Sequence, residues 1–269
     1  MRISSKDLEK VPNFQQEKDK FYLLNLISQS DNSIIYSDLK SYVIGRSHVG
    51  LPTWIWTAND ITPEEIINLV NDLDNYLDDG ENKITAKKDI YKLFSQLDYD
   101  VSSYFEMGYL SCENPIEPQN KKGRFVRASY SDIMTLAKMW VENEKEMEKK
   151  DIELYEAIET VEEWVKEENF YVLKNDLGKI VCMAGYSSLD DTAKITHVFT
   201  PKEERGKGYC KSLIYSLTKK LIDKGLKPLL YTDYNYKASN KAYQDVGYTD
   251  EGILINFTIT KQKDKDKQK

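Results

Sequence analysis

Alternating apolar and polar positions divide the second half of the chain into strands and helices. A β-branched, apolar run from Ala193 to Thr200 ends at a proline, and a charged turn containing two glycines follows. The next residues place apolar side chains three and four positions apart, which predicts an amphipathic helix that ends near Lys224, with Gly225 as its C′ residue. This succession of strand, glycine turn and helix is the feature around which the rest of the chain is interpreted.

The same pattern predicts further elements on both sides of this feature. Expected strands cover 124–128, 170–173, 179–186, 193–200, 229–232 and 248–258, and expected helices start near 131, 151, 209 and 237. Asn175 to Gly178 joins two of the strands as a hairpin turn. The order β-α-α-β-β-β-α-β-α-β predicts one α/β domain with a mixed sheet.

The first 110 residues form a smaller α/β alternation. A helical segment is expected up to about Asn32, strands at 33–36, 42–44, 51–56 and 104–110, and helices at 63–77 and 86–97, with a turn at 78–82. Thr62 followed by Pro63 and two glutamates is a helix start, with a hydroxyl N-cap and proline at the first helical position. Trp54 and Trp56 share one strand face, which favours packing over a ligand-binding wall.

A segment without apolar periodicity, 113–123, contains two prolines and ends at a glycine, so we expect a domain boundary there. The predicted organisation is an N-terminal α/β domain at 1–118, of unknown role, and a second domain at 119–260. Residues 261–269 form a charged tail that we expect to be disordered.

Composition narrows the function classes. The 269 residues are 40% hydrophobic and 31% charged, with net charge −7, which is typical of a globular protein and argues against nonspecific nucleic-acid binding. Neither a run of 18 apolar residues nor an apolar stretch near the N-terminus is present, so we expect no membrane partner and no signal peptide. Three distant cysteines predict reduced thiols in a cytoplasmic protein, and their spacing does not predict a metal site.

The glycine turn carries the clearest chemistry. Arg205-Gly206-Lys207-Gly208 directly precedes a helix, and glycines let backbone N–H groups approach a ligand while the helix N-terminus favours an anion. A bound phosphate group is therefore expected there. About 30 residues later, Asn235 and the helix carrying Ser239, Asn240 and Tyr243 place a polar row near the same end of the sheet.

These two segments resemble the GNAT family of N-acetyltransferases. Arg205 to Cys210 is similar to the family's Arg/Gln-x-x-Gly-x-Gly/Ala motif, and Asn235 with Ser239 to Tyr248 is similar to its second motif, which ends in glycine and an aromatic residue. The strand end Val198-Phe199-Thr200-Pro201 is also similar. The resemblance covers residues 124–260 and implies a central mixed, mostly antiparallel sheet flanked by helices. Cys210 departs from it, because the family has glycine or alanine there.

The resemblance also implies an activity and its residues. Acetyl-CoA would bind with its pyrophosphate on the amides of the turn and its pantetheine arm along the strand end. The implied cofactor-binding residues are Val198, Phe199, Thr200, Arg205, Gly206, Lys207, Gly208, Tyr209, Cys210, Asn235, Ser239 and Asn240. The asparagines suit helix capping or pantetheine binding, and Cys210 is expected to lie under the phosphates. Tyr243 matches the general acid that protonates the departing thiolate, with a buried core tyrosine as the alternative.

The general base is less defined. His197 precedes the expected thioester site, and its ordinary pKa suits proton removal near neutral pH. Simple alternation places it on the same face as Ile195 and Phe199, so a packed histidine is the alternative. A water chain, or Asp233 at a strand end, would also serve as base.

We therefore expect direct acetyl transfer to a primary amine in a ternary complex, with a small molecule favoured over a protein as acceptor. The run of acids from Glu142 to Asp151 is interpreted either as an acceptor wall for a cationic amine or as a solvated helix face. Two alternatives are a non-catalytic acyl-CoA sensor and a protein acetyltransferase docked by the N-terminal domain, which is itself conceivable as a divergent copy of the same fold. Oligomeric state, including a homodimer, is left open.

Overall fold

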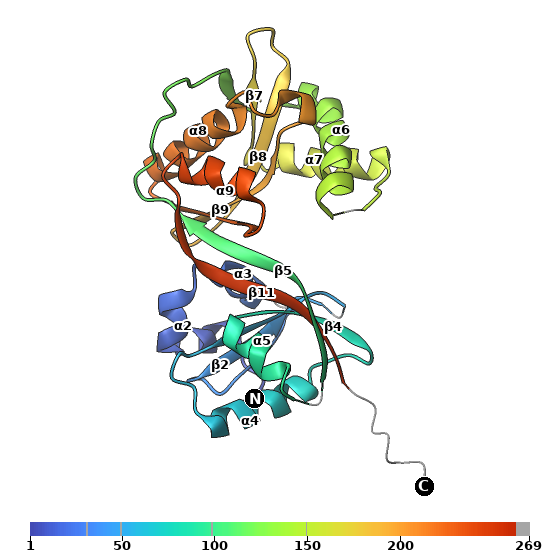
Figure 1. Ribbon diagram of the computed structural model, residues 1–269, viewed down its shortest axis with the longest axis vertical. Coiled ribbons are helices and arrows are strands. Elements are labelled where there is room, and N and C mark those ends of the chain that lie inside the picture. Colours follow the sequence, from blue (N-terminus) through green and yellow to red (C-terminus); the bar gives the residue numbers. More distant parts are fainter. Residues whose placement is uncertain (31, 49, 98, 149, 262–269) are drawn as a thin grey trace. The chain divides into compact units, whose positions relative to one another are not determined.

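The computed structural model describes residues 1–30, 32–48, 50–97, 99–148 and 150–261 (Figure 1). The chain forms two compact units. The first contains Met1–Tyr109, Asp233–Asn235 and Glu251–Lys269, and the second contains Leu110–Thr232 and Tyr236–Asp250. The predicted disordered tail lies, from residue 262 on, outside the described residues.

This division differs from the predicted boundary at 118/119. Strand β5 (Tyr99–Ser111) continues past the end of the first unit, and the last strand, β11 (Thr249–Lys261), pairs antiparallel with β4 (Glu81–Ala86). Ile255 lies opposite Ala86 in that pairing. The terminal strand that the hydrophobic pattern assigns to the second domain is therefore mostly a strand of the first unit, because its ladder partner is there.

The first unit is built on strands in the order β1-β2-β3-β4-β11-β5. Its other elements are α1 (Ser5–Leu8), α2 (Pro12–Glu17), α3 (Tyr22–Ser28), β1 (Ile34–Ser37), β2 (Tyr42–Arg46), β3 (Thr53–Thr57), α4 (Pro63–Asp74) and α5 (Lys88–Phe94). The expected N-terminal helix is thus three short helices. Strand β4 begins at Glu81, inside the expected turn at 78–82, and continues to Ala86. Asn82 and Ile84 are buried between exposed Glu81 and Lys83.

Both tryptophans of β3 are buried, which confirms their packing role. Trp54 lies edge-on to Phe21 and Trp56 edge-on to Phe14, with ring centroids 6.5 and 5.5 Å apart. The Trp56 indole N–H donates to the Glu17 carboxylate at 2.8 Å. Helix α4 begins as predicted.

The second unit contains a sheet in the order β10-β9-β8-β7-β6. Its elements are β6 (Arg124–Arg127), a 3₁₀ turn (Tyr130–Asp132), α6 (Ile133–Asn143), a π-helical segment (Glu144–Glu148), α7 (Leu154–Lys166), β7 (Phe170–Lys174), β8 (Ile180–Leu189), β9 (Thr192–Phe199), a 3₁₀ turn (Lys202–Glu204), α8 (Tyr209–Asp223), β10 (Lys227–Asp233) and α9 (Lys237–Gln244). Strands β6 to β9 pair antiparallel, and β9 pairs parallel with β10.

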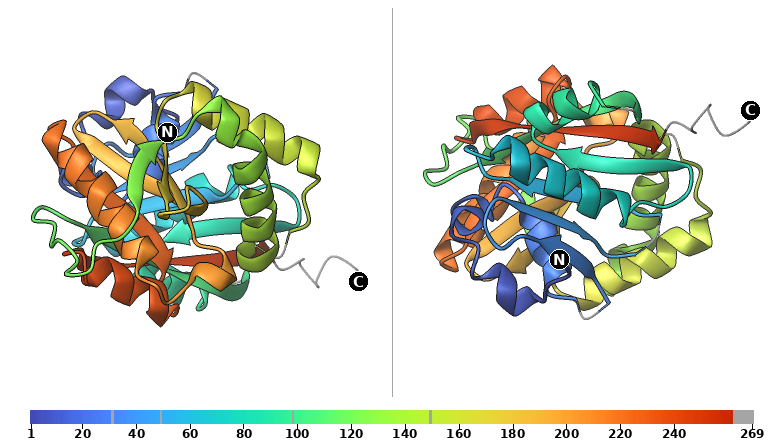
Figure 2. Two further views of the ribbon diagram at one scale, coloured as in Figure 1. Left: turned by 90° about the horizontal axis from the view of Figure 1, so that it is seen from above. Right: turned by 90° about the horizontal axis from the view of Figure 1, so that it is seen from below.

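Helices cover both faces of this sheet. Helices α6 and α7 lie on one face and α8 and α9 on the other (Figure 1; Figure 2, left). Two apolar clusters fill the two layers: one contains Leu136 and Val161 below α6 and α7, the other Leu213 and Leu217 below α8. The predicted fold class, a mixed and mostly antiparallel sheet flanked by helices, is confirmed.

The segment 113–123, expected to be the linker between the domains, is part of the second unit. The Ile116 N–H donates to the Val246 carbonyl at 2.7 Å, and the Lys122 N–H donates to the Ser212 hydroxyl at 3.0 Å. Gly247 has φ of +101°, and a Cβ there would lie 2.6 Å from the Asn114 carbonyl oxygen. Glycine is required at this position by both the backbone angle and the close approach.

Across the described ranges, no helix is long and apolar enough to cross a membrane.

Candidate active site

Strand β9 is interrupted just before the glycine turn. Its pairing with β8 passes from Gly185 opposite Thr196 to Met183 opposite Phe199, so two β9 residues face one β8 residue. His197, in the bulge, has φ of +54°. The parallel pairing with β10 runs from Thr192 to Ile195, while β9 itself continues to Phe199. The bulge therefore coincides with the point where β9 leaves β10.

Because of the bulge, the side chains of β9 lie on other faces of the sheet than simple alternation predicts. Ile195 belongs to the apolar cluster below α8, whereas Phe199 belongs to the cluster below α6 and α7. Val198 packs against the α8 cluster and His197 against the rings of α6 and α7. The prediction that Ile195, His197 and Phe199 share one face is wrong, because the extra residue shifts the alternation between them.

His197 is enclosed by aromatic rings. It stacks on Trp164 with centroids 4.3 Å apart and meets Trp140 edge-on at 5.0 Å. Burial, with a smaller contribution from the Lys194 ammonium, lowers its pKa from 6.5 to about 4. An imidazole with that pKa holds a proton poorly near neutral pH. The surroundings of His197 favour the packing alternative over a general base.

Replacing His197 by phenylalanine is expected to reduce the fall in the free energy of unfolding as the pH drops below 6.5. The folded protein prefers the neutral imidazole, so wild-type stability falls as pH drops from 6.5 towards 4, because the unfolded chain binds the extra proton. The difference between the two pKa values predicts a wild-type loss of roughly 2 kcal/mol between pH 7 and pH 5 from this group. Urea unfolding of both proteins at these two pH values measures this loss of stability. Equal losses in wild type and variant would show that His197 does not stay neutral in the folded protein.

The turn between β9 and α8 has the predicted geometry. Gly206 and Gly208 have φ of +71° and +87°, and Gly208 is the N-cap of α8. A Cβ added at either glycine would meet nothing within 4 Å. The positive φ angles, rather than crowding within the protein, account for both glycines. The first amides of α8 are left to bind an anion, since helical hydrogen bonding does not use them.

Arg205 connects this turn to the segment between α6 and α7. Its guanidinium makes two hydrogen bonds with the Glu146 carboxylate, at 2.6 and 2.9 Å, and its Nε donates to the Thr200 carbonyl at 2.8 Å. Lys202 adds a longer ion pair with Glu146 at 3.8 Å. The Arg205 guanidinium lowers the pKa of Glu146. The Lys207 ammonium instead bonds the Glu204 carboxylate at 2.9 Å.

Helix α9 brings Tyr243 into the cluster below α8. Tyr243 is 7% exposed, and burial raises its pKa well above the ordinary 10, so its hydroxyl stays protonated. The Ser239 hydroxyl lies 3.2 Å from that of Thr232 and donates to the Tyr236 carbonyl. Asn240 continues the helix one position later. Asn235, just before α9, is exposed, and its N–H donates to the Asp233 carboxylate at 2.8 Å.

One apolar cluster brings together four of the predicted site residues from three elements. It contains Tyr243 from α9 and is packed by Val198 from β9 and by Tyr209 and Cys210 from α8. His197 and Phe199 lie on the opposite face of the sheet. Glu146 and Cys182 are residues of this site that local sequence patterns do not indicate. Glu146 is 59 positions from its partner Arg205, and Cys182 looks like an ordinary apolar position of β8. The acidic run was the only signal for Glu146.

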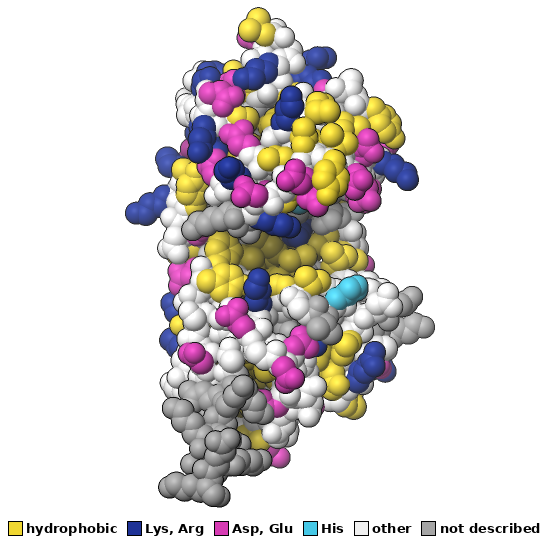
Figure 3. Space-filling model, turned by 90° about the vertical axis from the view of Figure 1, so that its right-hand side faces the viewer, with side chains coloured by type: hydrophobic (Ala, Val, Ile, Leu, Met, Phe, Trp, Pro, Cys, Tyr) yellow, Lys and Arg dark blue, Asp and Glu magenta, His cyan; other side chains and the backbone are white. Residues whose placement is uncertain are grey.

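The acidic run from Glu142 to Asp151 is not uniformly solvated. Glu144 is buried, Glu146 is bound by Arg205, and Asp151 is exposed. Figure 3 shows acidic, basic and hydrophobic side chains interspersed on one face of the molecule. The solvated-face interpretation therefore does not describe the whole run, and the acceptor wall stays a prediction.

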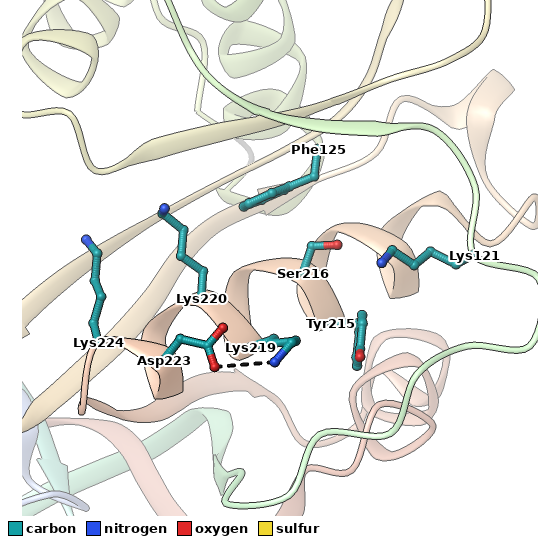
Figure 4. Close-up of a pocket in the computed structure, with 8 residues that line it drawn as sticks. All are labelled: Lys121, Phe125, Tyr215, Ser216, Lys219, Lys220, Asp223 and Lys224. Carbon is teal, nitrogen blue, oxygen red and sulfur yellow. Dashed lines mark hydrogen bonds and ion pairs between the residues drawn. The ribbon is translucent and has the colours of Figure 1, made fainter.

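A separate hollow lies along the outer face of α8 (Figure 4). Its volume is about 530 Å³, and its lining is Lys121, Phe125, Tyr215, Ser216, Lys219, Lys220, Asp223 and Lys224. Three of its four lysines are in the last turns of α8 or directly after it, where cations interact favourably with the helix C-terminus. None of the predicted site residues lines this hollow.

Comparison with known proteins identifies the second unit. Residues 133–248 match the model of the acetyltransferase (GNAT) family. No curated protein matches the sequence. In the described part of the chain, no group of three or more His, Cys, Asp or Glu side chains is arranged to hold a metal ion.

Solved structures share the fold at low identity. An acetyltransferase from the GNAT family of Colwellia psychrerythraea is 12% identical with a TM-score of 0.62, covering 97% of this chain and 99% of that one. A GCN5-related N-acetyltransferase from Sphaerobacter thermophilus is 11% identical with a TM-score of 0.66, covering 96% and 93%. The shared fold thus extends over the N-terminal unit as well.

Proposed function

The C-terminal half of this chain is a GNAT-family acetyltransferase domain, and from that premise we propose that the protein transfers acetyl from acetyl-CoA to a primary amine. The observation that carries the proposal is the single cluster in which the bulged strand β9, the first turn of α8 directly after the glycine turn, and the buried Tyr243 meet. A phosphate-binding turn beside a protonated phenol suits a donor that carries both phosphates and a leaving thiolate.

The turn from Arg205 to Cys210 would hold the pyrophosphate of the donor. Gly206 and Gly208 keep backbone N–H groups available at the start of α8, and the helix N-terminus favours negative charge. The β9 segment from Val198 to Thr200 lies beyond the β9–β10 pairing and would pair with the pantetheine arm as a further strand does. A backbone N–H of this segment would then polarise the thioester carbonyl.

The chemical step is direct attack by a neutral amine. The amine nitrogen forms a bond to the thioester carbon, the C–S bond breaks, and the thiolate leaves with the proton that Tyr243 donates. The amine nitrogen gives one proton to water, and a proton from water restores the Tyr243 hydroxyl. Ser239 and Asn240, on the same helix as Tyr243, would contact the pantetheine arm. We place Cys210 under the phosphates, so the proposed mechanism has no acyl-enzyme intermediate.

The acceptor is tested by a screen for thiol release. Wild-type protein with acetyl-CoA is offered polyamines, aminoglycosides, amino acids and peptides, and free CoA is measured over time. We expect release with at least one class of small amine, with mass spectrometry detecting the acetylated product. Acetyl-CoA binding without transfer to any amine or peptide would support the sensor alternative instead.

Replacing Glu146 by glutamine is expected to weaken acetyl-CoA binding by about five-fold. The loss of a half-buried, two-point ion pair is worth on the order of 1 kcal/mol, and it releases the Arg205 side chain that ties the turn to the Thr200 carbonyl. Calorimetric titration with acetyl-CoA measures it. Glu162→Gln, on the exposed face of α7, is the matched control; unchanged or tighter binding in Glu146→Gln would remove Glu146 from the donor site.

A further inference from the structure

Two thiols meet inside the donor cluster. Cys182, on β8, is fully buried, and Cys210, in the first turn of α8, is partly exposed. Cys210 packs against the apolar cluster that contains Cys182, and the two side chains are in hydrogen-bond contact. The Thr200 hydroxyl donates to the Cys182 sulfur at 3.1 Å. Cys210 is also the residue that departs from the family's glycine or alanine, so the donor site carries a thiol pair where the family pattern has a small, inert side chain.

The two thiols are not equivalent. The Cys182 thiol donates to the Cys210 sulfur, which lowers the pKa of Cys210, while burial raises the pKa of Cys182. Cys210 is the more exposed thiol and the one whose pKa is lowered, so it is the nucleophile of the pair, because the thiolate is the reactive form. Cys182 is the resolving thiol, which reacts with the oxidised Cys210 in the second step.

We propose that Cys182 and Cys210 are a modification site at which a hydroperoxide oxidises the two thiols to a disulfide. The Cys210 thiolate attacks the peroxide oxygen, the O–O bond breaks, and the sulfur becomes a sulfenic acid as water or an alcohol leaves. The Cys182 sulfur then displaces water from that sulfenic acid and forms the S–S bond. Two thiols lose two electrons and two protons, and the hydroperoxide takes up both.

The disulfide would change donor binding. A sulfur–sulfur bond is about 2.05 Å long, much shorter than a hydrogen-bond contact between thiols, so it draws the first turn of α8 towards β8. That turn carries the amides that we assign to the pyrophosphate, and this consequence rests on the proposed function. Tyr243 belongs to the same apolar cluster as Cys182, and Cys210 packs against that cluster, so the disulfide also alters the surroundings of Tyr243. Oxidation is expected to weaken acetyl-CoA binding at least ten-fold.

The test combines hydrogen peroxide treatment with peptide mapping. The full-length protein is treated with limiting hydrogen peroxide, alkylated, digested without reductant and analysed by mass spectrometry. Cys112, which is buried and whose pKa burial raises to about 11, is the matched control thiol. Wild type and Cys112→Ala should give the 182–210 disulfide, and dithiothreitol should reverse it. Cys182→Ala should stop at a sulfenic acid on Cys210, detected with dimedone, and Cys210→Ala should not react.

Binding supplies the second readout. Calorimetric titration with acetyl-CoA before oxidation, after oxidation and after reduction should show an affinity loss of at least ten-fold and its recovery in wild type. In Cys210→Ala, whatever its own affinity, oxidation should not change the affinity. Oxidation at Cys112 as readily as at Cys210, absence of the disulfide, or a disulfide with unchanged acetyl-CoA affinity would each overturn the proposal. A disulfide that forms in a protein unable to bind acetyl-CoA in either state would contradict the proposed function and this binding consequence, and leave the oxidation chemistry standing.

Discussion

Replacing Tyr243 by phenylalanine is expected to lower kcat by about 10²- to 10⁴-fold, the usual range for loss of general acid catalysis. Tyr243 is 7% exposed, and burial keeps its hydroxyl protonated. The phenylalanine ring fills the same apolar space and removes the proton that the departing thiolate needs. Steady-state kinetics with an amine found in the screen measures the change, and because the acid acts on the leaving group, affinity for acetyl-CoA should change little.

Tyr248→Phe is the matched control for this variant. Its hydroxyl lies 2.7 Å from that of Thr218 in a buried pair, so its removal leaves a buried hydroxyl with one partner fewer and lowers stability by about 1 kcal/mol. Turnover per folded molecule should stay near the wild-type value. Equal kcat in Tyr243→Phe and wild type would exclude Tyr243 as the acid and support its alternative as a core residue.

The double variant Gly206→Ala/Gly208→Ala is expected to weaken acetyl-CoA binding by at least 30-fold. Both glycines have φ between +70° and +90°, which alanine adopts at a cost of roughly 1–2 kcal/mol per residue. The free turn is expected to relax out of this conformation, and binding would then have to restore it. Two such costs amount to roughly 2–4 kcal/mol of lost affinity, measured by titration calorimetry.

The control is Gly178→Ala/Gly225→Ala. These glycines have φ of +80° and +78°, and a Cβ at either would also meet nothing within 4 Å. Gly178 closes the β7–β8 turn and Gly225 follows α8, so both variants carry similar backbone strain in different places. Only the variant at the α8 turn should lose affinity. Similar losses in both would show that general destabilisation, and not the turn, sets acetyl-CoA binding.

Local patterns predicted the glycine turn and the helix that follows it. The apolar spacing of α8, the glycines before it and Gly225 after it all act within a few residues, and the structure has each in place. Thr62 likewise accepts from the Glu65 N–H and caps α4 as expected. Features of this kind depend on neighbouring residues alone, so they can be predicted from the sequence without knowledge of the fold.

Features that depend on distant partners were not predictable in the same way. The bulge at His197 shifts the strand's facing without any glycine or proline to mark it. Strand β4 was not predicted, because its first residues are polar and overlap the expected turn. Its pairing with the distant strand β11 makes this segment a strand. The contacts of Arg205 with Glu146 and of Cys210 with Cys182 join elements far apart along the chain.

The path of the chain also affects how the N-terminal unit is studied. Because β11 pairs with β4, deletion of the predicted first domain removes the partner of a strand that starts in the second unit. Point variants in the full-length protein are therefore preferable to truncation for separating small-amine from protein acceptors.

Thermal unfolding with and without acetyl-CoA tests the central claim most directly. A ligand at 100 times its Kd stabilises the native state by about 2.7 kcal/mol, which for a chain of this size raises Tm by roughly 5–10 °C. We predict such a rise for wild type and a much smaller one for Gly206→Ala/Gly208→Ala at the same acetyl-CoA concentration. An unchanged Tm for wild type at saturating acetyl-CoA would contradict the assignment of this protein as an acetyl-CoA-dependent acetyltransferase.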